Sequence, residues 1–154
     1  MKPPHGLIEI ISAFGDPRLH MDDHAAWEAE AIASFDLPYP LSFCDQPVRK
    51  IRTHKLVGEI LVSVFDEILK SGLVEDATEY GGCYNFRAIR GMPRFISTHT
   101  WGIAIDLNPS ANPLGGEADQ NEDVVAIFKG HGFTWGGEFI NRKDPMHFQF
   151  ASGY

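Results

Sequence analysis

Residues 97–107, STHTWGIAIDL, carry the strongest signal in the sequence for both the fold and a functional site. The run 103–107 is apolar and β-prone, but Asp106 stands inside it. A carboxylate in a buried strand is costly to leave unpaired, and a metal ion is one of the few adequate partners. Gly102 allows the backbone to turn between His99 and Asp106, because residues seven apart on one straight strand would face opposite sides of a sheet.

A further candidate ligand lies in residues 144–150, DPMHFQF. Strand alternation puts His147 and Gln149 on one face of this segment and its two phenylalanines on the core face. Two imidazoles and one carboxylate form a common catalytic zinc set that leaves a fourth position open. We therefore predict that His99, Asp106 and His147 bind Zn²⁺ through bonds of about 2.0–2.2 Å.

Asp144 lies three residues before His147, across Pro145, which stiffens the approach. A carboxylate at this place can accept a proton from an attacking water and pass it to a leaving amine. Spacing alone leaves a second interpretation open, in which Asp144 is an ordinary turn residue before a proline.

The remaining pattern predicts an α+β domain. The clearest helix is expected at 54–70, where apolar residues recur as adjacent pairs every four residues, with Thr53 as its N-cap and Gly72 as its left-handed C-terminal residue. Helices first and short strands later, without βαβ alternation, favour a small antiparallel sheet with flanking helices. The other expected elements are a strand at 6–11, a helix from Asp22 or Asp23 to about residue 34, an irregular proline-rich loop at 38–47, strands at 74–80, 103–107, 133–135 and 146–150, a surface loop at 109–119 and a helix at 119–129.

Length and composition limit the classes of protein. The 154 residues fit one domain, 1–154, and a 44% hydrophobic content can form a core without disulfide bonds. The net charge of -8 argues against a nucleic-acid partner, and the basic group at 49–55 is interpreted as a solvated surface. No run approaches the roughly 20 apolar residues needed to span a bilayer, so the protein is not expected to be membrane-embedded.

The N-terminus and the cysteines bear on the cellular compartment. The first residues, MKPPHGLIEI, contain no long apolar run, so synthesis in the cytoplasm without a secretory signal is predicted. Cys44 and Cys83 are too few for a disulfide framework and do not form a CxxC pair. We expect two buried free thiols, and a bridge between them stays open.

Three segments together resemble the M15 zinc peptidases, a family that includes D-alanyl-D-alanine carboxypeptidases and phage L-alanyl-D-glutamate endolysins. Residues 97–106 resemble the SxHxxGxAxD motif of that family, and Asp144-Pro145-Met146-His147-Phe148 is similar to its closing acid-x-x-His element. Residues 133–137, FTWGG, resemble the FxWGG segment that precedes this element. The resemblance covers roughly 81–150, whereas the first fifty residues match no motif of the family.

The resemblance implies His99, Asp106 and His147 as zinc ligands and Asp144 as general base. Many relatives have Glu at the base position, which makes Glu138, six residues upstream, the rival carboxylate.

The family also has an arginine in a GYR-like context that steadies the substrate carbonyl. Residues 82–87, GCYNFR, are the nearest match, so the resemblance assigns this role to Arg87. Arg90 is the second candidate, with an ordinary surface arginine as the alternative.

Three further residues are candidates for substrate binding. Ser97 either orients a ligand and contacts substrate or serves as a structural hydroxyl. Trp101 and Trp135 flank the proposed ligands in sequence and are expected to wall the cleft, with plain core packing expected for at least one of them.

The resemblance implies a fold like that of hedgehog domains and D-Ala-D-Ala peptidases, and zinc-dependent hydrolysis of peptidoglycan stem peptides. The cleaved bond would be L-Ala-D-Glu for an endopeptidase or the terminal D-Ala bond for a carboxypeptidase. The protein is expected to be a monomer that reaches the cell wall after phage-type release. The alternative is a non-catalytic zinc-binding interaction module of hedgehog-like fold, against which the intact base and arginine positions argue.

Overall fold

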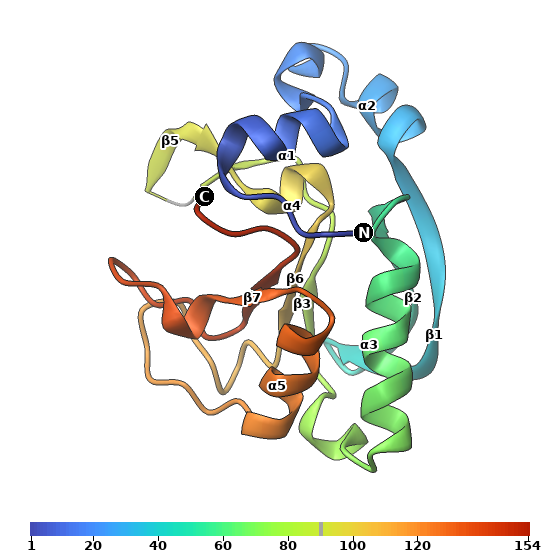
Figure 1. The fold of residues 1–154 in the computed structure, drawn as a ribbon. Coiled ribbons are helices and arrows are strands. Elements are labelled where there is room, and N and C mark those ends of the chain that lie inside the picture. The colour runs from blue at the N-terminus through green and yellow to red at the C-terminus, as the bar shows by residue number, and fades with distance from the viewer. Residues whose placement is uncertain (90) are drawn as a thin grey trace.

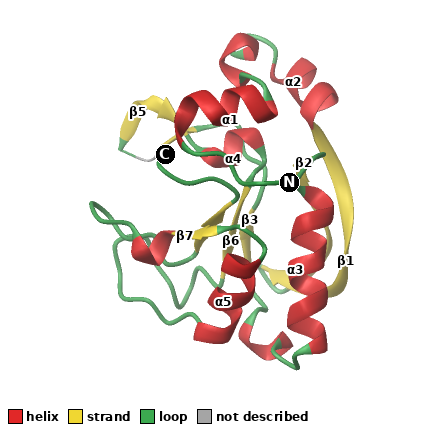
Figure 2. Ribbon diagram, viewed as in Figure 1, coloured by secondary structure: helices red, strands yellow, loops and turns green. Residues whose placement is uncertain are grey.

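The structure is a computed structural model that describes residues 1–89 and 91–154 (Figures 1 and 2). It combines helices with small antiparallel sheets, which confirms the predicted α+β class. Its elements in chain order are α1 (Gly6–Phe14), η1 (Pro17–His20), α2 (His24–Ala31), β1 (Ile32–Phe43), β2 (Gln46–His54), α3 (Gly58–Lys70), η2 (Val74–Asp76), β3 (Tyr80–Gly82), β4 (Ala88–Ile89), β5 (Met92–Ile96), α4 (Thr98–Trp101), β6 (Ala104–Leu107), α5 (Glu122–Gly130), β7 (Thr134–Trp135), η3 (Gly136–Glu138) and β8 (His147–Gln149).

The sheet that organises the candidate site has the strand order β3-β6-β8-β7, and all its pairs are antiparallel. Helix α5 packs against this sheet, because its Phe128 stacks on Phe148 of β8 at 4.1 Å between ring centroids. Helix α3 packs in turn against α5, where Phe65 meets Phe128 edge-on. Figure 1 shows α3 between α5 and the β1–β2 hairpin. The face of β8 opposite Phe148 carries His147 and Gln149, as strand alternation predicts.

Helix α3 confirms the apolar stripe predicted for 54–70 but begins later, at Gly58. The buried residues Leu61, Val64, Phe65 and Ile68 lie on one face of it, and each contributes roughly 1.5–3 kcal/mol through burial. The predicted start is wrong because His54 still belongs to β2, which pairs with β1, and residues 55–57 form a turn before the helix.

The predicted caps of α3 have different outcomes. Thr53 pairs with Ala33 in the hairpin and donates its hydroxyl to the Gly102 carbonyl, so Val57 takes the N-cap position without a side-chain hydrogen bond. Gly72 follows the helix at φ 72°, which confirms the left-handed residue expected there.

Two predictions for the N-terminal third are wrong. Residues 6–11 belong to α1 rather than to a strand, because Ile10 and Phe14, four residues apart, both turn into the core. The proline-rich stretch 38–47 lies in the β1–β2 hairpin rather than in an irregular loop. Its register shifts between Asp36 and Leu41, so the prolines of β1 fall where the ladder is interrupted and no backbone donor is needed.

The remaining expectations agree in part. Asp23 caps α2 by accepting a hydrogen bond from Ala26 N at 3.1 Å, but the helix ends at Ala31 because β1 begins there. The strand expected at 74–80 is limited to its last residue, because Val74–Asp76 form the 3-10 turn η2. The strands and helix expected after residue 100 are present with shifted ends, as is the loop at 109–119.

Both cysteines are free, but only Cys83 is buried. The expectation of two buried thiols is wrong for Cys44, which lies in the exposed β1–β2 turn at φ 48°. In the part of the chain that the structure describes, no helix is long and apolar enough to cross a membrane.

His54 at the end of β2 is a buried neutral imidazole that links the hairpin to α1. Its Nε2–H donates to the Phe14 carbonyl at 3.2 Å, and its Nδ1 accepts from the Leu56 N–H at 3.2 Å. Burial lowers the pKa of His54 to about 4. A proton on Nδ1 would point at the Leu56 N–H, so two donors would face each other, which agrees with the lowered pKa of His54.

We expect the free energy of unfolding to fall as pH drops from 6.5 to 4, by a His54 contribution of about 3 kcal/mol. The unfolded chain protonates His54 below about pH 6.5, whereas the native protein resists protonation until about pH 4. His54→Gln removes this contribution, so urea unfolding at several pH values should give the variant a flatter profile than the wild type. Equal pH slopes for the two proteins would contradict the assignment.

Candidate metal centre

The local fold of residues 97–107 brings His99 and Asp106 together. Ser97 accepts a hydrogen bond from His99 N at 3.3 Å and thereby starts the short helix α4. Gly102 ends α4 in a left-handed conformation at φ 68°, and a Cβ there would lie 2.7 Å from the backbone nitrogen of His54. The predicted turn at Gly102 is therefore present, and β6 then carries Asp106 back toward the imidazole.

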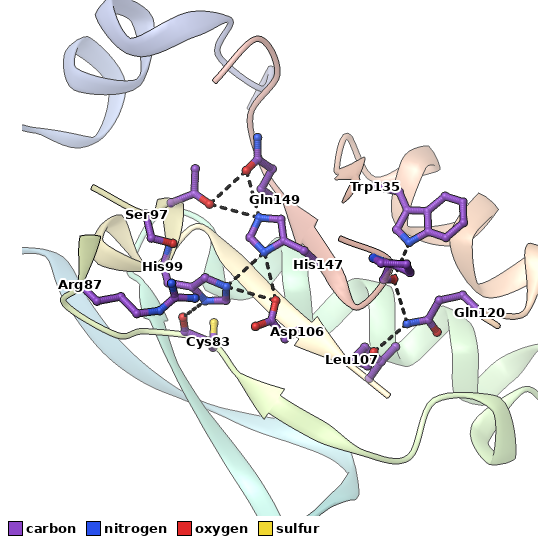
Figure 3. Close-up of polar contacts among 12 residues, drawn as sticks. Cys83, Arg87, Ser97, His99, Asp106, Leu107, Gln120, Trp135, His147 and Gln149 are labelled. Atoms are coloured by element: carbon purple, nitrogen blue, oxygen red, sulfur yellow. Dashed lines mark hydrogen bonds and ion pairs between the residues drawn. The ribbon is translucent and has the colours of Figure 1, made fainter. Parts of the chain in front are cut away.

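The third side chain arrives through the pairing of β6 with β8, in which Asp106 stands opposite His147. His99 Nε2 lies 3.2 Å from Asp106 Oδ1 and 3.2 Å from His147 Nδ1, and His147 Nδ1 lies 3.0 Å from Asp106 Oδ1 (Figure 3). The three atoms thus form a nearly equilateral triangle.

This triangle has the dimensions of one face of a zinc coordination tetrahedron. Ligand bonds of about 2.0–2.1 Å in tetrahedral geometry separate the ligand atoms by about 3.3–3.4 Å. The separations of 3.0–3.2 Å among the His99, Asp106 and His147 atoms are close to that value. The arrangement therefore fits a metal ion that keeps one further position for water or substrate.

The hydrogen bonds behind the two rings decide which nitrogens carry protons. His99 Nδ1 lies against the Cys83 carbonyl, so it donates there and leaves a lone pair on Nε2. His147 Nε2 lies 3.0 Å from Gln149 Oε1, which leaves the lone pair on Nδ1. Two lone pairs and the Asp106 carboxylate consequently converge on one point, where a cation is needed to offset their repulsion.

The electrostatics of the three side chains agree with this view. Burial would raise the pKa of Asp106, but hydrogen bonds from His147 and His99 outweigh it and hold that pKa well below its usual range. Burial would lower the pKa of His147, but the hydrogen bond and charge of Asp106 raise it overall. Both directions indicate that positive charge is favourable beside the Asp106 carboxylate, as expected for a cation site.

Asp144 lies in the same pocket, in the turn that precedes β8. Its backbone is fixed by hydrogen bonds from Asp144 N to Gly136 O at 2.9 Å and from His147 N to Asp144 O at 3.0 Å. A side chain at Gly136 would overlap the Asp144 backbone, which explains the need for glycine there. Oδ1 of Asp144 is buried and has no hydrogen-bond partner among the residues that the structure describes, and burial raises the pKa of this carboxyl.

Glu138, the rival carboxylate, also lines the pocket but has a different environment. Its side chain is exposed and pairs with Lys129 Nζ at 2.7 Å. The Glu138 carboxylate is thus engaged by a lysine, whereas Asp144 Oδ1 has no hydrogen-bond partner among the described residues.

Arg87 and Ser97 line the pocket together with the three metal-ligand candidates. The Arg87 backbone is fixed to α4, because its carbonyl accepts from Ser97 N at 3.0 Å and its N–H donates to Thr100 Oγ1 at 3.0 Å. These contacts fix where the Arg87 side chain leaves the backbone (Figure 3). Arg90, the second candidate, lies outside the described residues.

The two tryptophans expected to wall the cleft have packing roles. Trp101 is fully buried, meets Tyr154 edge-on and donates from Nε1 to the Gly15 carbonyl at 2.9 Å. Trp135 stacks on Phe148 and donates to the Pro145 carbonyl at 2.7 Å, which steadies the segment between Asp144 and His147 (Figure 3). Neither indole lines the pocket.

The pocket has a volume of about 710 Å³ and a rim that the sequence does not predict. Ile140 on this rim is 99% exposed, and Phe95 is 47% exposed. The sequence offers no signal for this rim, since it is assembled from segments distant along the chain. Its apolar members are Ile89, Phe95, Leu114, Phe139, Ile140 and Met146.

A comparison with known families finds a match in the part of the chain that carries the candidate site. Residues 90–150 match the M15 family model described as D-alanyl-D-alanine carboxypeptidase, and Arg87 lies outside the matched segment. A comparison with curated proteins finds no match. The matched segment contains His99, Asp106, His147 and Asp144, so this part of the chain is similar to that family's model.

Proposed function

We propose that the protein is a zinc-dependent peptidase that hydrolyses amide bonds in peptidoglycan stem peptides, with residues 1–154 as one domain. The observation that carries this proposal is the convergence of three ligand atoms, 3.0–3.2 Å apart, beside an unpartnered buried carboxylate oxygen. The match to a carboxypeptidase family supports the substrate class, which lies in the cell wall.

In this proposal His99 Nε2, Asp106 Oδ1 and His147 Nδ1 hold the metal ion. Zinc, when bound, supplies a Lewis acid that polarises the scissile carbonyl and lowers the pKa of a water to about 7. The deep burial of His99 and His147 keeps bulk water from competing for the ligand atoms.

Asp144 is the general base of the proposed reaction. Its free Oδ1 can take the proton of the attacking water and deliver it to the nitrogen of the leaving amine. Burial raises the pKa of this carboxyl, which makes it a stronger base than an exposed aspartate.

Arg87 stabilises the negative charge that develops on the substrate carbonyl oxygen. Arg87→Gln is expected to lower kcat by about 10²–10³-fold, because a positioned donor to the oxyanion is lost. Zinc content should not change, since Arg87 is not a ligand. Arg49→Gln, which removes an exposed arginine on β2, is the control. An unchanged kcat for Arg87→Gln would contradict this role.

Digestion of purified peptidoglycan tests the proposal. The wild type and Asp144→Ala are each incubated with the polymer, and the new peptide termini are identified by mass spectrometry. New N-terminal D-Glu would establish the endopeptidase, and released D-Ala would establish the carboxypeptidase. Zinc binding by the wild type without any cleavage would contradict the peptidase and support a zinc-binding interaction module.

A further inference from the structure

Gln149 is buried directly behind a candidate metal ligand, on the side away from the metal position. It is only 3% exposed, and its Oε1 lies 3.0 Å from His147 Nε2 and 3.0 Å from Thr98 Oγ1 (Figure 3). Alternation along β8 places Gln149 on the same face as His147. Thr98 comes from the short helix α4. Three polar groups from two elements therefore meet behind the ring.

The neighbours of Gln149 fix which way its amide points. Its Nε2 donates to the backbone oxygens of Ala151 at 3.4 Å and of Tyr154 at 3.2 Å. A flipped amide would turn its own oxygen toward these two acceptors and its NH₂ toward the ring of His147. Oε1 therefore faces His147, where the Thr98 hydroxyl also donates to it.

This orientation selects one tautomer of His147. An acceptor at Oε1 requires the proton on Nε2, which leaves the lone pair on Nδ1 directed at Asp106 and His99. The opposite tautomer would place an N–H where the metal ion has to lie. The orientation of the amide thus determines whether the ring can serve as a ligand.

We propose that Gln149, held by Thr98, is a positioning residue that keeps His147 in its metal-binding tautomer and ring orientation. The inference rests on the zinc binding of the proposed function. A neutral amide fits this position, because Asp106 already supplies the anionic ligand and a buried second carboxylate would face the two backbone oxygens that Gln149 now satisfies.

Zinc affinity, measured by competition with a chelator, tests the inference. Gln149→Met keeps the volume but removes the nearer acceptor of His147 Nε2 and leaves only the Thr98 hydroxyl at 3.3 Å, so it should weaken zinc binding by about 10–100-fold. Gln120→Met is the matched control, since Gln120 is a buried glutamine bonded to backbone oxygens of Leu107 and Pro145 but to neither histidine ring. An equal loss in both variants would reflect general loosening of the sheet and would overturn the inference.

A spectroscopic measurement separates positioning from a structural role. In the Co²⁺-substituted protein, the paramagnetic ion shifts the N–H protons of its histidine ligands out of the main proton spectrum. The wild type should show such N–H signals from His99 and His147 that exchange slowly with solvent. In Gln149→Met the His147 N–H signal should disappear or exchange faster with solvent, while the His99 signal should stay unchanged. An unaltered His147 signal would overturn the inference.

Thr98→Val provides a second variant in case Gln149→Met does not fold. It removes the hydroxyl that holds Oε1 but preserves the side-chain shape, so it should weaken zinc binding less than Gln149→Met, and Thr98→Ser should restore it. If Thr98→Val and Gln149→Met both bind zinc with wild-type affinity, the inference about Gln149 is rejected but the proposed function is not. A wild type that binds no zinc would reject the proposed function as well.

Discussion

Asp106→Asn is expected to abolish zinc binding and peptidoglycan hydrolysis together. The substitution keeps the size of the side chain but removes the only anionic ligand of the triangle. It also places an NH₂ group where it can bond to the imidazole lone pairs in place of the metal ion. Metal analysis after dialysis should give about one zinc per chain for the wild type and essentially none for the variant.

Asp45→Asn is the matched control for this experiment. Asp45 lies in the exposed β1–β2 turn at φ 61°, a conformation that asparagine adopts as readily as aspartate. Zinc content and hydrolysis should therefore equal those of the wild type. Retention of both properties in Asp106→Asn would contradict the ligand assignment.

Asp144→Asn is expected to lower kcat by about 10²–10⁴-fold, the usual contribution of a general base. Zinc content should remain that of the wild type, because Asp144 is not among the three side chains that form the triangle. Hydrolysis of peptidoglycan and zinc content have to be measured on the same samples. The combination of a filled metal site and a slow reaction distinguishes this variant from Asp106→Asn.

Glu138→Gln completes this comparison. Because Glu138 is exposed and paired with Lys129, its replacement should leave kcat close to that of the wild type. A large loss in Glu138→Gln with an unaffected Asp144→Asn would assign the base to Glu138 instead.

The pH dependence of the reaction follows from the same assignment. A general base acts only when deprotonated, so kcat should fall on the acid side as pH drops through the pKa of Asp144. Burial raises that pKa, which moves the acid limb to a higher pH than an exposed aspartate would give. Asp144→Asn should lose this limb, and a wild-type profile that persists in the variant would assign it to another group.

The convergence of the three candidate metal ligands could be predicted from the sequence because its constraints are local. Gly102 and the apolar residues around Asp106 indicate a turn and a buried strand, and both are present. The alternation around His147 is equally local, and it places Gln149 on the correct face of β8. The proposed role of Gln149 in orienting the ring could not be predicted, because it depends on Thr98, which lies in another element.

The errors arise where packing between distant segments decides the conformation. Residues 6–11 are short enough to fit either a strand or a helix, and contacts with the core select the helix. The prolines at 38–47 indicate a break in pairing, but a bulge confines that break within a hairpin. Sequence proximity placed Trp101 near the cleft, whereas α4 turns its indole toward Gly15.

Anomalous X-ray scattering at the zinc absorption edge, from crystals of the wild-type protein grown with zinc, shows directly whether these three side chains hold the metal ion. We expect one strong peak about 2.0–2.2 Å from His99 Nε2, Asp106 Oδ1 and His147 Nδ1. The absence of a peak inside this triangle, or zinc held by other side chains, would contradict this assignment.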